Sequence, residues 1–146
     1  MSQENMAVVE RYWKSLDRAL ERHWTPGGPS LRDAFALEGL ADLVQPDVEW
    51  ISTWALEPFR GGEQLVRATE DWVEAGDEWR LQAEDLIPAA GGLVLTVLRV
   101  SIRGSGSGVP VEQRLYTVCR IRDGKIALIH DFLDRKDALE AAGLEE

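Results

Sequence analysis

The sequence is poor in the residues that build disulfides and metal sites. Its 146 residues include one cysteine, Cys119, and two histidines, His23 and His130. A single cysteine cannot form a disulfide within the chain, and with only two histidines beside it the chain lacks the ligands of a structural zinc site. We therefore predict no metal and no cofactor, and we interpret Cys119 as a small buried residue.

Basic residues and long apolar runs are also scarce. The 16 lysines and arginines are outnumbered by 26 acidic residues, which gives a formal net charge of −10. This balance argues against nucleic acid as a partner, because phosphate binding requires a clustered basic surface. No apolar run approaches the roughly 20 residues that cross a membrane, and no secretion signal precedes the first helical pattern. The sequence thus predicts a cytoplasmic protein with no membrane partner.

Helical periodicity dominates the first half of the chain. Apolar residues recur at three- and four-residue spacing over residues 3–22, which predicts an amphipathic helix. Prolines and glycines then make a loop over residues 23–30, and helical spacing resumes over residues 31–44 as one helix or two short ones. Another helix is predicted over residues 63–75.

Alternating apolar residues predict the strands of the second half. The predicted strands are 48–54, 79–87, 93–103, 109–122 and 125–133. A helix over residues 135–142 follows them, and the glycine-rich run 104–108 is interpreted as a flexible hairpin turn because it leads into a strand and not a helix. Helices followed by a four-stranded antiparallel run predict a single α+β domain, residues 1–146, whose curved sheet wraps around the N-terminal helices.

The last predicted strand carries a carboxylate on an apolar face. Asp131 shares its face with Ile129 and Leu133 at two-residue spacing, where an unpaired charge is costly. Arg99 has similar apolar neighbours on its own strand. A charge-assisted hydrogen bond between Arg99 and Asp131 would satisfy both groups, either as a functional pair or as an inert ion pair.

The turn before that strand fixes which residues face Asp131. A three-residue turn with Gly124 in a left-handed bulge places Leu115 opposite Asp131, whereas a two-residue Asp-Gly turn places Tyr116 there. We prefer the first register because it separates polar from apolar residues. The outer face still carries large apolar groups, so we predict a homodimer through the outer face of the sheet.

Six tryptophans are many for a chain of this length. Trp50, Trp54, Trp72 and Trp79 could line a pocket for a flat or cyclic apolar ligand, although each could also simply fill the core.

Four segments together resemble the SnoaL-like proteins of the NTF2-like superfamily over almost the whole chain. The segments are Ala7-Val8-Val9-Glu10-Arg11-Tyr12, Pro46-Asp47-Val48-Glu49-Trp50, Phe59-Arg60-Gly61 and the stretch from Asp123 to Asp134. The resemblance implies a cone-shaped α+β barrel with a deep apolar pocket, often a homodimer. That superfamily contains both enzymes and non-catalytic binding proteins.

The resemblance also implies candidate roles. Tyr12 falls at the oxyanion-hole tyrosine of ketosteroid isomerases, whereas Ser52 and Thr117 replace their two aspartates. Asp131 matches the acid/base aspartate of SnoaL-type polyketide cyclases, with Ile129 in place of a nearby histidine.

A third comparison concerns limonene-type epoxide hydrolases. Arg99 and Asp131 match two members of their Asp–Arg–Asp set, and Ser101 replaces the third.

We therefore predict a pocket for a small apolar, oxygen-bearing molecule, with Asp131 as general acid/base, Arg99 as its partner and Tyr12 and Ser52 as hydrogen-bond donors; the reaction, if any, is expected to be a cofactor-free hydrolysis, isomerisation or cyclisation. The predicted binding residues are Ser52, Trp50, Trp54, Trp72, Ser101, Thr117, Cys119 and Ile129. The alternative is a non-catalytic binding or dimerisation module. The segment 23–38 is longer than the family's usual link, and we predict that it covers the pocket mouth or extends the dimer contact.

Overall fold

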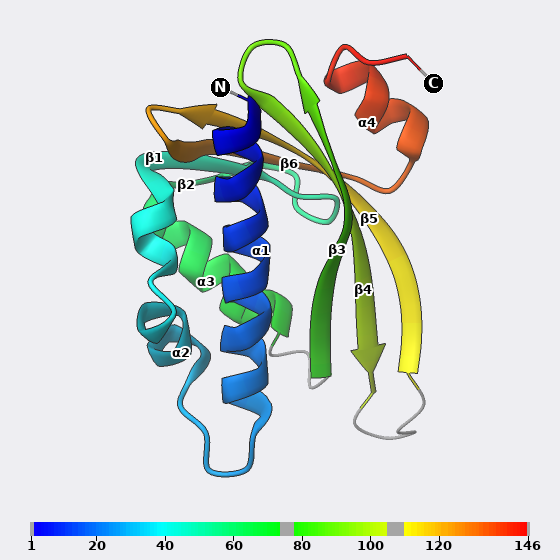
Figure 1. The fold of residues 1–146 in the computed structure, drawn as a ribbon. Helices are drawn as coiled ribbons and strands as arrows, with labels where there is room; N and C mark the ends of the chain where they lie inside the picture. The colour runs from blue at the N-terminus through cyan, green and yellow to red at the C-terminus, as the bar shows by residue number, and fades with distance from the viewer. Residues whose placement is uncertain (1, 74–77, 105–109, 146) are drawn as a thin grey trace.

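The computed structural model describes residues 2–73, 78–104 and 110–145 (Figure 1). The predicted hairpin at 104–108 and the end of the predicted helix 63–75 fall largely outside these residues. The described helices are α1 (Ser2–Trp24), α2 (Leu31–Leu37), the 3-10 helix η1 (Leu40–Leu43), α3 (Gly61–Val73) and α4 (Arg135–Ala141). The described strands are β1 (Val44–Ile51), β2 (Phe59–Arg60), β3 (Glu78–Ala89), β4 (Leu93–Arg103), β5 (Pro110–Arg122) and β6 (Lys125–Phe132).

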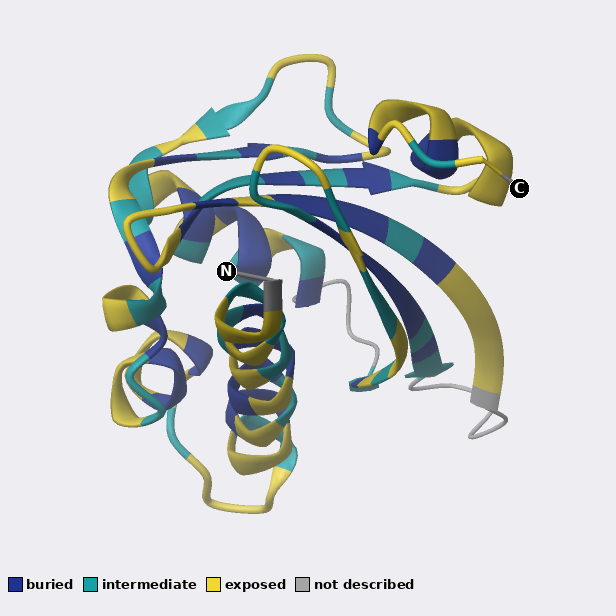
Figure 2. Cartoon of the chain, turned by 45° about the horizontal axis from the view of Figure 1, so that its top comes forward, coloured by how far each residue is buried: buried dark blue, intermediate teal, exposed yellow. Residues whose placement is uncertain are grey.

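Helix α1 lies along the concave side of the sheet. Its apolar stripe is buried, and the tightest members are Val9, Ala19 and Leu20, each with no exposed surface. The opposite side of α1 is exposed, as its 3.6-residue period requires. Figure 2 shows the sheet arching over this helix, which confirms the predicted α+β architecture. No helix within the described ranges is long and apolar enough to span a membrane.

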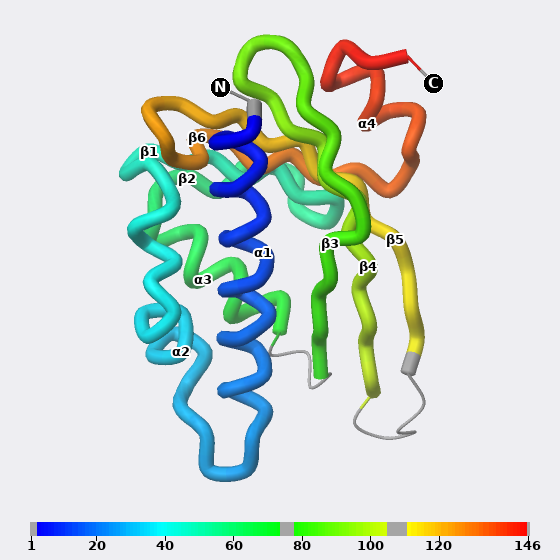
Figure 3. Tube along the Cα trace, in the orientation of Figure 1, coloured from blue at the N-terminus to red at the C-terminus, as the bar shows by residue number. Residues whose placement is uncertain are grey.

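The sheet is mixed and open. Its strand order is β2-β1-β6-β5-β4-β3, and the strands from β3 to β6 form the predicted antiparallel meander. Strand β1 joins this meander in parallel with β6. Figure 3 shows β6 running beside β1, although α3 and four strands separate the two in the chain. The described strands therefore form one curved, open sheet with helices on its concave side, and they do not close into a barrel.

The turn between β5 and β6 has two residues, Asp123 and Gly124. Both have a positive φ, 53° and 75°, as a tight hairpin turn with the twist of the flanking strands requires. Arg122 and Lys125 are the pair that closes the turn. The predicted three-residue turn is therefore wrong.

A β-bulge restores the predicted face after this turn. The register shifts after Arg120, so that Ala127 has no partner of its own on β5. The extra residue returns Asp131 to the concave face, where it lies opposite Thr117. The predicted partner Leu115 and the alternative Tyr116 were thus both wrong, while the predicted face of Asp131 is correct.

Helix α4 covers part of the convex face of the sheet. Asp134 caps it by accepting a hydrogen bond from the Lys136 backbone N–H at 2.8 Å, as predicted. Its buried residues Ala138 and Leu139 pack against Leu95 and Val118 of the sheet. The chain therefore buries some of the apolar outer face that led us to predict a dimer.

Candidate functional site

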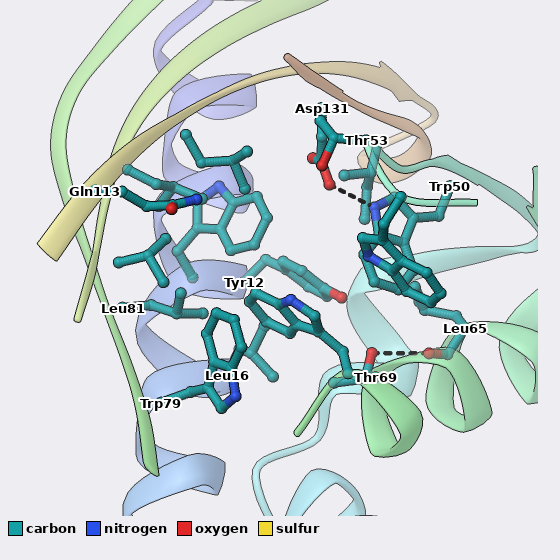
Figure 4. A pocket seen from close by; sticks show the side chains of 17 residues that line it. Tyr12, Leu16, Trp50, Thr53, Leu65, Thr69, Trp79, Leu81, Gln113 and Asp131 are labelled. Atoms are coloured by element: carbon teal, nitrogen blue, oxygen red, sulfur yellow. Dashed lines mark hydrogen bonds between the residues drawn. The ribbon is translucent and has the colours of Figure 1, made fainter. Parts of the chain in front are cut away.

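A cavity lies between α1, α3 and the concave face of the sheet. Its volume is about 70 Å³, roughly twice the volume that one water molecule occupies in the liquid. The residues that line it are Tyr12, Trp13, Leu16, Trp50, Thr53, Trp54, Leu65, Thr69, Trp72, Trp79, Leu81, Leu98, Val100, Gln113, Leu115, Ile129 and Asp131. Figure 4 shows Asp131 at one end and the aromatic side chains around the remaining space.

Asp131 is the buried carboxyl of this cavity. It lies on β6, and its side chain accepts a hydrogen bond at Oδ2 from Nε1 of Trp50 on the neighbouring β1, at 2.8 Å (Figure 4). Its Oδ1 atom is buried and has no partner among the described residues. Burial raises the pKa of Asp131 to about 7, and the Trp50 hydrogen bond offsets only part of this rise. At neutral pH the carboxyl is therefore close to equally protonated and ionised.

Tyr12 brings a hydroxyl from α1 into the same cavity. Its side chain is 2% exposed. Burial raises the pKa of Tyr12 well above its usual value, and nearby Cys119 and Asp131 raise it further. The phenol stays protonated at physiological pH, so it remains a hydrogen-bond donor.

Five tryptophans from four parts of the chain surround the cavity. Trp13 comes from α1, Trp50 and Trp54 from β1 and the loop after it, Trp72 from α3, and Trp79 from β3. The rings of Trp50 and Trp54 are nearly perpendicular, at 83°, with centroids 6.1 Å apart. Those of Trp72 and Trp79 are tilted by 41° at 4.2 Å. Trp54 is 50% exposed and stands at the open side of the cavity.

A row of polar residues runs across the sheet from Asp131. Thr96 on β4 pairs with Thr117 on β5, which pairs with Asp131 on β6. Both threonines have no exposed surface, and neither hydroxyl has a partner within the described part of the chain. Buried hydroxyls without hydrogen-bond partners lower the free energy of unfolding, so these two threonines destabilise the sheet beside the cavity.

Arg99 does not reach Asp131. Leu98 and Val100 line the cavity, so Arg99 between them points to the convex face, where it donates a hydrogen bond to Gln82. The predicted Arg99–Asp131 pair is therefore absent from the described structure, and Trp50 takes the place of Arg99 as the partner. Ser101 lies on the same convex face and is also outside the cavity.

The structure brings together six of the predicted site residues. The cavity contains Tyr12, Trp50, Trp54, Trp72, Ile129 and Asp131, and also Trp79, which the sequence analysis named as a candidate wall residue.

Three other predicted residues are buried near the cavity without lining it. They are Ser52, Thr117 and Cys119. The Ser52 hydroxyl accepts a hydrogen bond from the Ala55 backbone N–H and so fixes the loop that carries Trp54. Burial raises the pKa of the Cys119 thiol, which leaves it an inert core residue at neutral pH.

The sequence reasoning missed several lining residues, among them Trp13, Thr69 and Gln113. Trp13 and Thr69 belong to the apolar stripes of α1 and α3, and such a stripe does not distinguish a cavity wall from a packed core. Gln113 is an exposed polar residue on β5, and its sequence neighbours gave no signal of a site.

The segment 23–38 braces the helices and does not line the cavity. Leu31 and Phe35 of α2 are buried in the core, and Arg32 forms ion pairs with Glu63 and Glu70 of α3 at 2.9 and 2.8 Å. No residue of this segment lines the cavity, which argues against the predicted cover of the pocket mouth, while the alternative that the segment extends a dimer contact stays a prediction. Within the described ranges, no group of three histidine, cysteine or acidic side chains could hold a metal ion.

The sequence matches the model of one protein family, the SnoaL-like domain, over residues 31–129. This match covers more than half of the chain. A search of curated protein sequences found no match.

Solved structures with the same fold cover almost the whole chain. An LEH-like epoxide hydrolase from M. tuberculosis is 16% identical with a TM-score of 0.64, and the alignment covers 97% of this chain and 90% of that one. A putative SnoaL-like polyketide cyclase from Jannaschia sp. CCS1 is 18% identical with a TM-score of 0.66, covering 99% and 95%. A Catenulispora acidiphila protein with a ketosteroid isomerase-like fold, solved in complex with trimethylamine, is 16% identical with a TM-score of 0.63, covering 94% and 93%. At these identities the likeness shows the fold alone. The family match and the fold agree with the resemblance seen in the sequence, and the chain belongs to the SnoaL-like family of NTF2-like proteins.

Proposed function

We propose that the chain is a cofactor-free enzyme that binds a small, mostly apolar, oxygen-bearing molecule in the cavity and moves a proton with Asp131. The observation that carries this proposal is the state of the Asp131 carboxyl. One oxygen is held by Trp50, the other is buried without a partner, and the whole group lines an apolar cavity. A fixed carboxyl with one uncommitted oxygen is suited to proton transfer.

The pKa of Asp131 supports the same proposal. A general acid/base works best when its pKa lies near the working pH, and burial raises that of Asp131 to about 7. Trp50 orients the carboxyl through Oδ2, so the proton is exchanged at Oδ1. Tyr12 then donates a hydrogen bond to the substrate oxygen on which negative charge develops, because its phenol stays protonated.

The composition of the cavity favours some reactions over others. Among the residues that the structure describes, Asp131 is the one carboxyl that lines the cavity, and none of these lining residues is an arginine. A single carboxyl that takes a proton from carbon and returns it elsewhere is sufficient for isomerisation or for cyclisation of an enolisable ketone. Epoxide hydrolysis needs one group to activate water and another to protonate the epoxide, so we favour isomerisation or cyclisation.

The test measures proton exchange directly, so it does not require the product of the natural reaction to be known. Wild-type protein is incubated in D₂O with a panel of small cyclic ketones, and NMR measures exchange at the carbon next to the carbonyl. We expect wild type to accelerate exchange, Asp131→Asn to lose about 100-fold or more, and Tyr12→Phe to lose less. The matched control is Arg99→Gln, which we expect to behave as wild type because Arg99 lies on the convex face.

Two results would overturn the proposal. Equal exchange with wild type and Asp131→Asn would show that the carboxyl does no chemistry. Binding of the ketones without any exchange in wild type would favour the non-catalytic binding module instead.

We also propose that the chain forms a homodimer through the part of the convex face that α4 leaves free. Leu128 and His130 lie on this part and are only half-buried, and burial lowers the pKa of His130, which favours its neutral form. Light scattering on the purified chain tests this: a monomer at concentrations of tens of micromolar would contradict it.

A further inference from the structure

We infer that the cavity binds small alkylammonium cations, with the aromatic rings as its walls and Asp131 as the counter-charge. This inference concerns binding alone and does not rest on the proposed proton transfer. It uses three properties of the lining: its aromatic content, its charge and its size.

The first property is the density of aromatic rings. Six of the 17 lining residues are aromatic, namely Tyr12 and five tryptophans. An ammonium ion is attracted to the face of an aromatic ring within about 6 Å of its centre, and tryptophan is the strongest such partner. The planes of Trp50 and Trp54 meet at 83°, and those of Tyr12 and Trp13 at 77°. Rings at such angles surround a cation from several sides, which a single stacked pair cannot do.

The second property is the charge of the lining. Asp131 is charged when ionised, and no lysine, arginine or histidine of the described part of the chain lines the cavity. Its Oδ1 atom has no partner among the described residues, so a bound cation would supply the compensation that the buried carboxylate lacks. The formal charge of −10 favours the approach of a cation to the chain over that of an anion.

The third property is the size and apolar character of the space. A volume of about 70 Å³ is roughly half that of an engineered apolar cavity of about 150 Å³ that binds benzene, so the enclosed space admits a small methylated head, and a longer substituent has to extend past the half-exposed Trp54. A primary ammonium group has three N–H donors that each need an acceptor, whereas a quaternary one has none. Because most of the lining is apolar carbon, we expect methylated ammonium groups to be preferred over primary amines.

The cation should bind the ionised form of Asp131, so its affinity depends on pH. The groups that face Asp131 are Trp50 from β1, Tyr12 from α1 and Cys119 from β5. Trp50 carries no ionisable group, and burial raises the pKa values of Tyr12 and Cys119. Asp131, with a pKa of about 7, is thus the group that titrates. We expect binding to be roughly 30-fold weaker at pH 5.5 than at pH 8.5, because the carboxyl must first lose its proton.

Calorimetric titration of the full chain with two matched probes tests the inference. The probes are choline and 3,3-dimethylbutan-1-ol, which have the same shape but differ in the positive charge. At pH 8.5 we expect choline to bind at least about tenfold tighter, and the preference to disappear at low pH. Equal affinities for the two probes at pH 8.5, or a choline affinity that does not change with pH, would overturn the inference.

Variants separate the two sources of attraction. Asp131→Asn should weaken choline about tenfold or more at pH 8.5 and remove its pH dependence, with little effect on the neutral probe. Trp54→Leu keeps apolar bulk at the exposed rim but removes an aromatic face, so it should weaken choline several-fold more than the alcohol. Trp24→Phe is the control, because Trp24 does not line the cavity. If Trp54→Leu weakened both probes equally, the rings would act only as apolar walls and the inference would fail.

The outcome is independent of the ketone exchange assay. Choline binding without ketone exchange would support the cation site and overturn the proposed enzyme, while exchange without choline binding would do the reverse.

Discussion

Replacing Asp131 by asparagine should make the protein relatively more stable at high pH. The buried carboxyl has a pKa of about 7 in the folded chain, against a usual value of 3.8. Between these values the folded chain holds a proton that the unfolded chain has lost. The free energy of unfolding therefore falls as the pH rises through this window, and it levels off above pH 7.

The magnitude follows from the width of the window. Each pH unit within it corresponds to about 1.4 kcal/mol, so ionised Asp131 destabilises the folded chain by about 4 kcal/mol relative to its protonated form. About 3 kcal/mol of this lies between pH 4.5 and 8.5. Asparagine has nearly the same shape and keeps an oxygen that can accept from Trp50, but it does not titrate. Its extra N–H donors add a cost that does not vary with pH.

The measurement is urea unfolding of wild type and Asp131→Asn, followed by tryptophan fluorescence at several pH values. Ion pairs elsewhere in the chain titrate alike in both proteins, so the difference between the two free energies of unfolding isolates Asp131. We expect this difference to shift in favour of the variant by about 3 kcal/mol from pH 4.5 to 8.5. A constant difference over this range would refute the assignment of Asp131 as a buried, weakly compensated carboxyl.

Two further substitutions test other features of the structure. Thr96→Val removes a buried hydroxyl that has no partner in the described part of the chain, so we expect the free energy of unfolding to rise by about 1 kcal/mol; a clear loss of stability would mean that the hydroxyl is satisfied. Gly92→Ala should destabilise the chain by at least about 1 kcal/mol more than Gly91→Ala. Both glycines have a positive φ, 75° and 77°, but only at Gly92 would the new Cβ lie 2.8 Å from a backbone carbonyl oxygen of β5. Equal effects of the two changes in thermal unfolding would contradict this close contact.

The cost that Asp131 imposes also bears on its role. A carboxyl that lowers stability by several kcal/mol at neutral pH is poorly explained as a packing residue, because an apolar side chain would fill the same space without it. The same property gives Asp131 a pKa near 7 and leaves one oxygen free for a substrate proton or a cation. Stability and function therefore depend on the same buried group.

The local elements of the fold were predictable from the sequence. Apolar spacing located α1 and α3, alternation located the four strands of the meander, and Asp134 marked the start of α4. These signals are local because hydrogen bonds within a helix or at a cap join residues a few positions apart. The position of Asp131 on the apolar, concave face was predictable for the same reason.

The pairing of Arg99 with Asp131 was wrong because alternation carries little information on β4. This strand is buried on both sides: Leu98 and Val100 face the cavity, while Leu95 packs under α4 on the convex face. When both faces are covered, apolar residues no longer mark the inner one. The burial of the convex face of β4 thus depends on α4, a helix far along the chain, and the alternation within β4 does not show it.

The partner of Asp131 was likewise settled by tertiary structure. Trp50 reaches Asp131 because β1 joins β6 in parallel across 81 positions of sequence, and the bulge at Ala127 returns the carboxyl to the concave face. The sequence by itself determined that a carboxylate would be buried on this strand. Only the strand order and the bulge decided that an indole and not a guanidinium would face it, because pairings between distant strands depend on the packing of the whole sheet and leave no periodic signal in either segment.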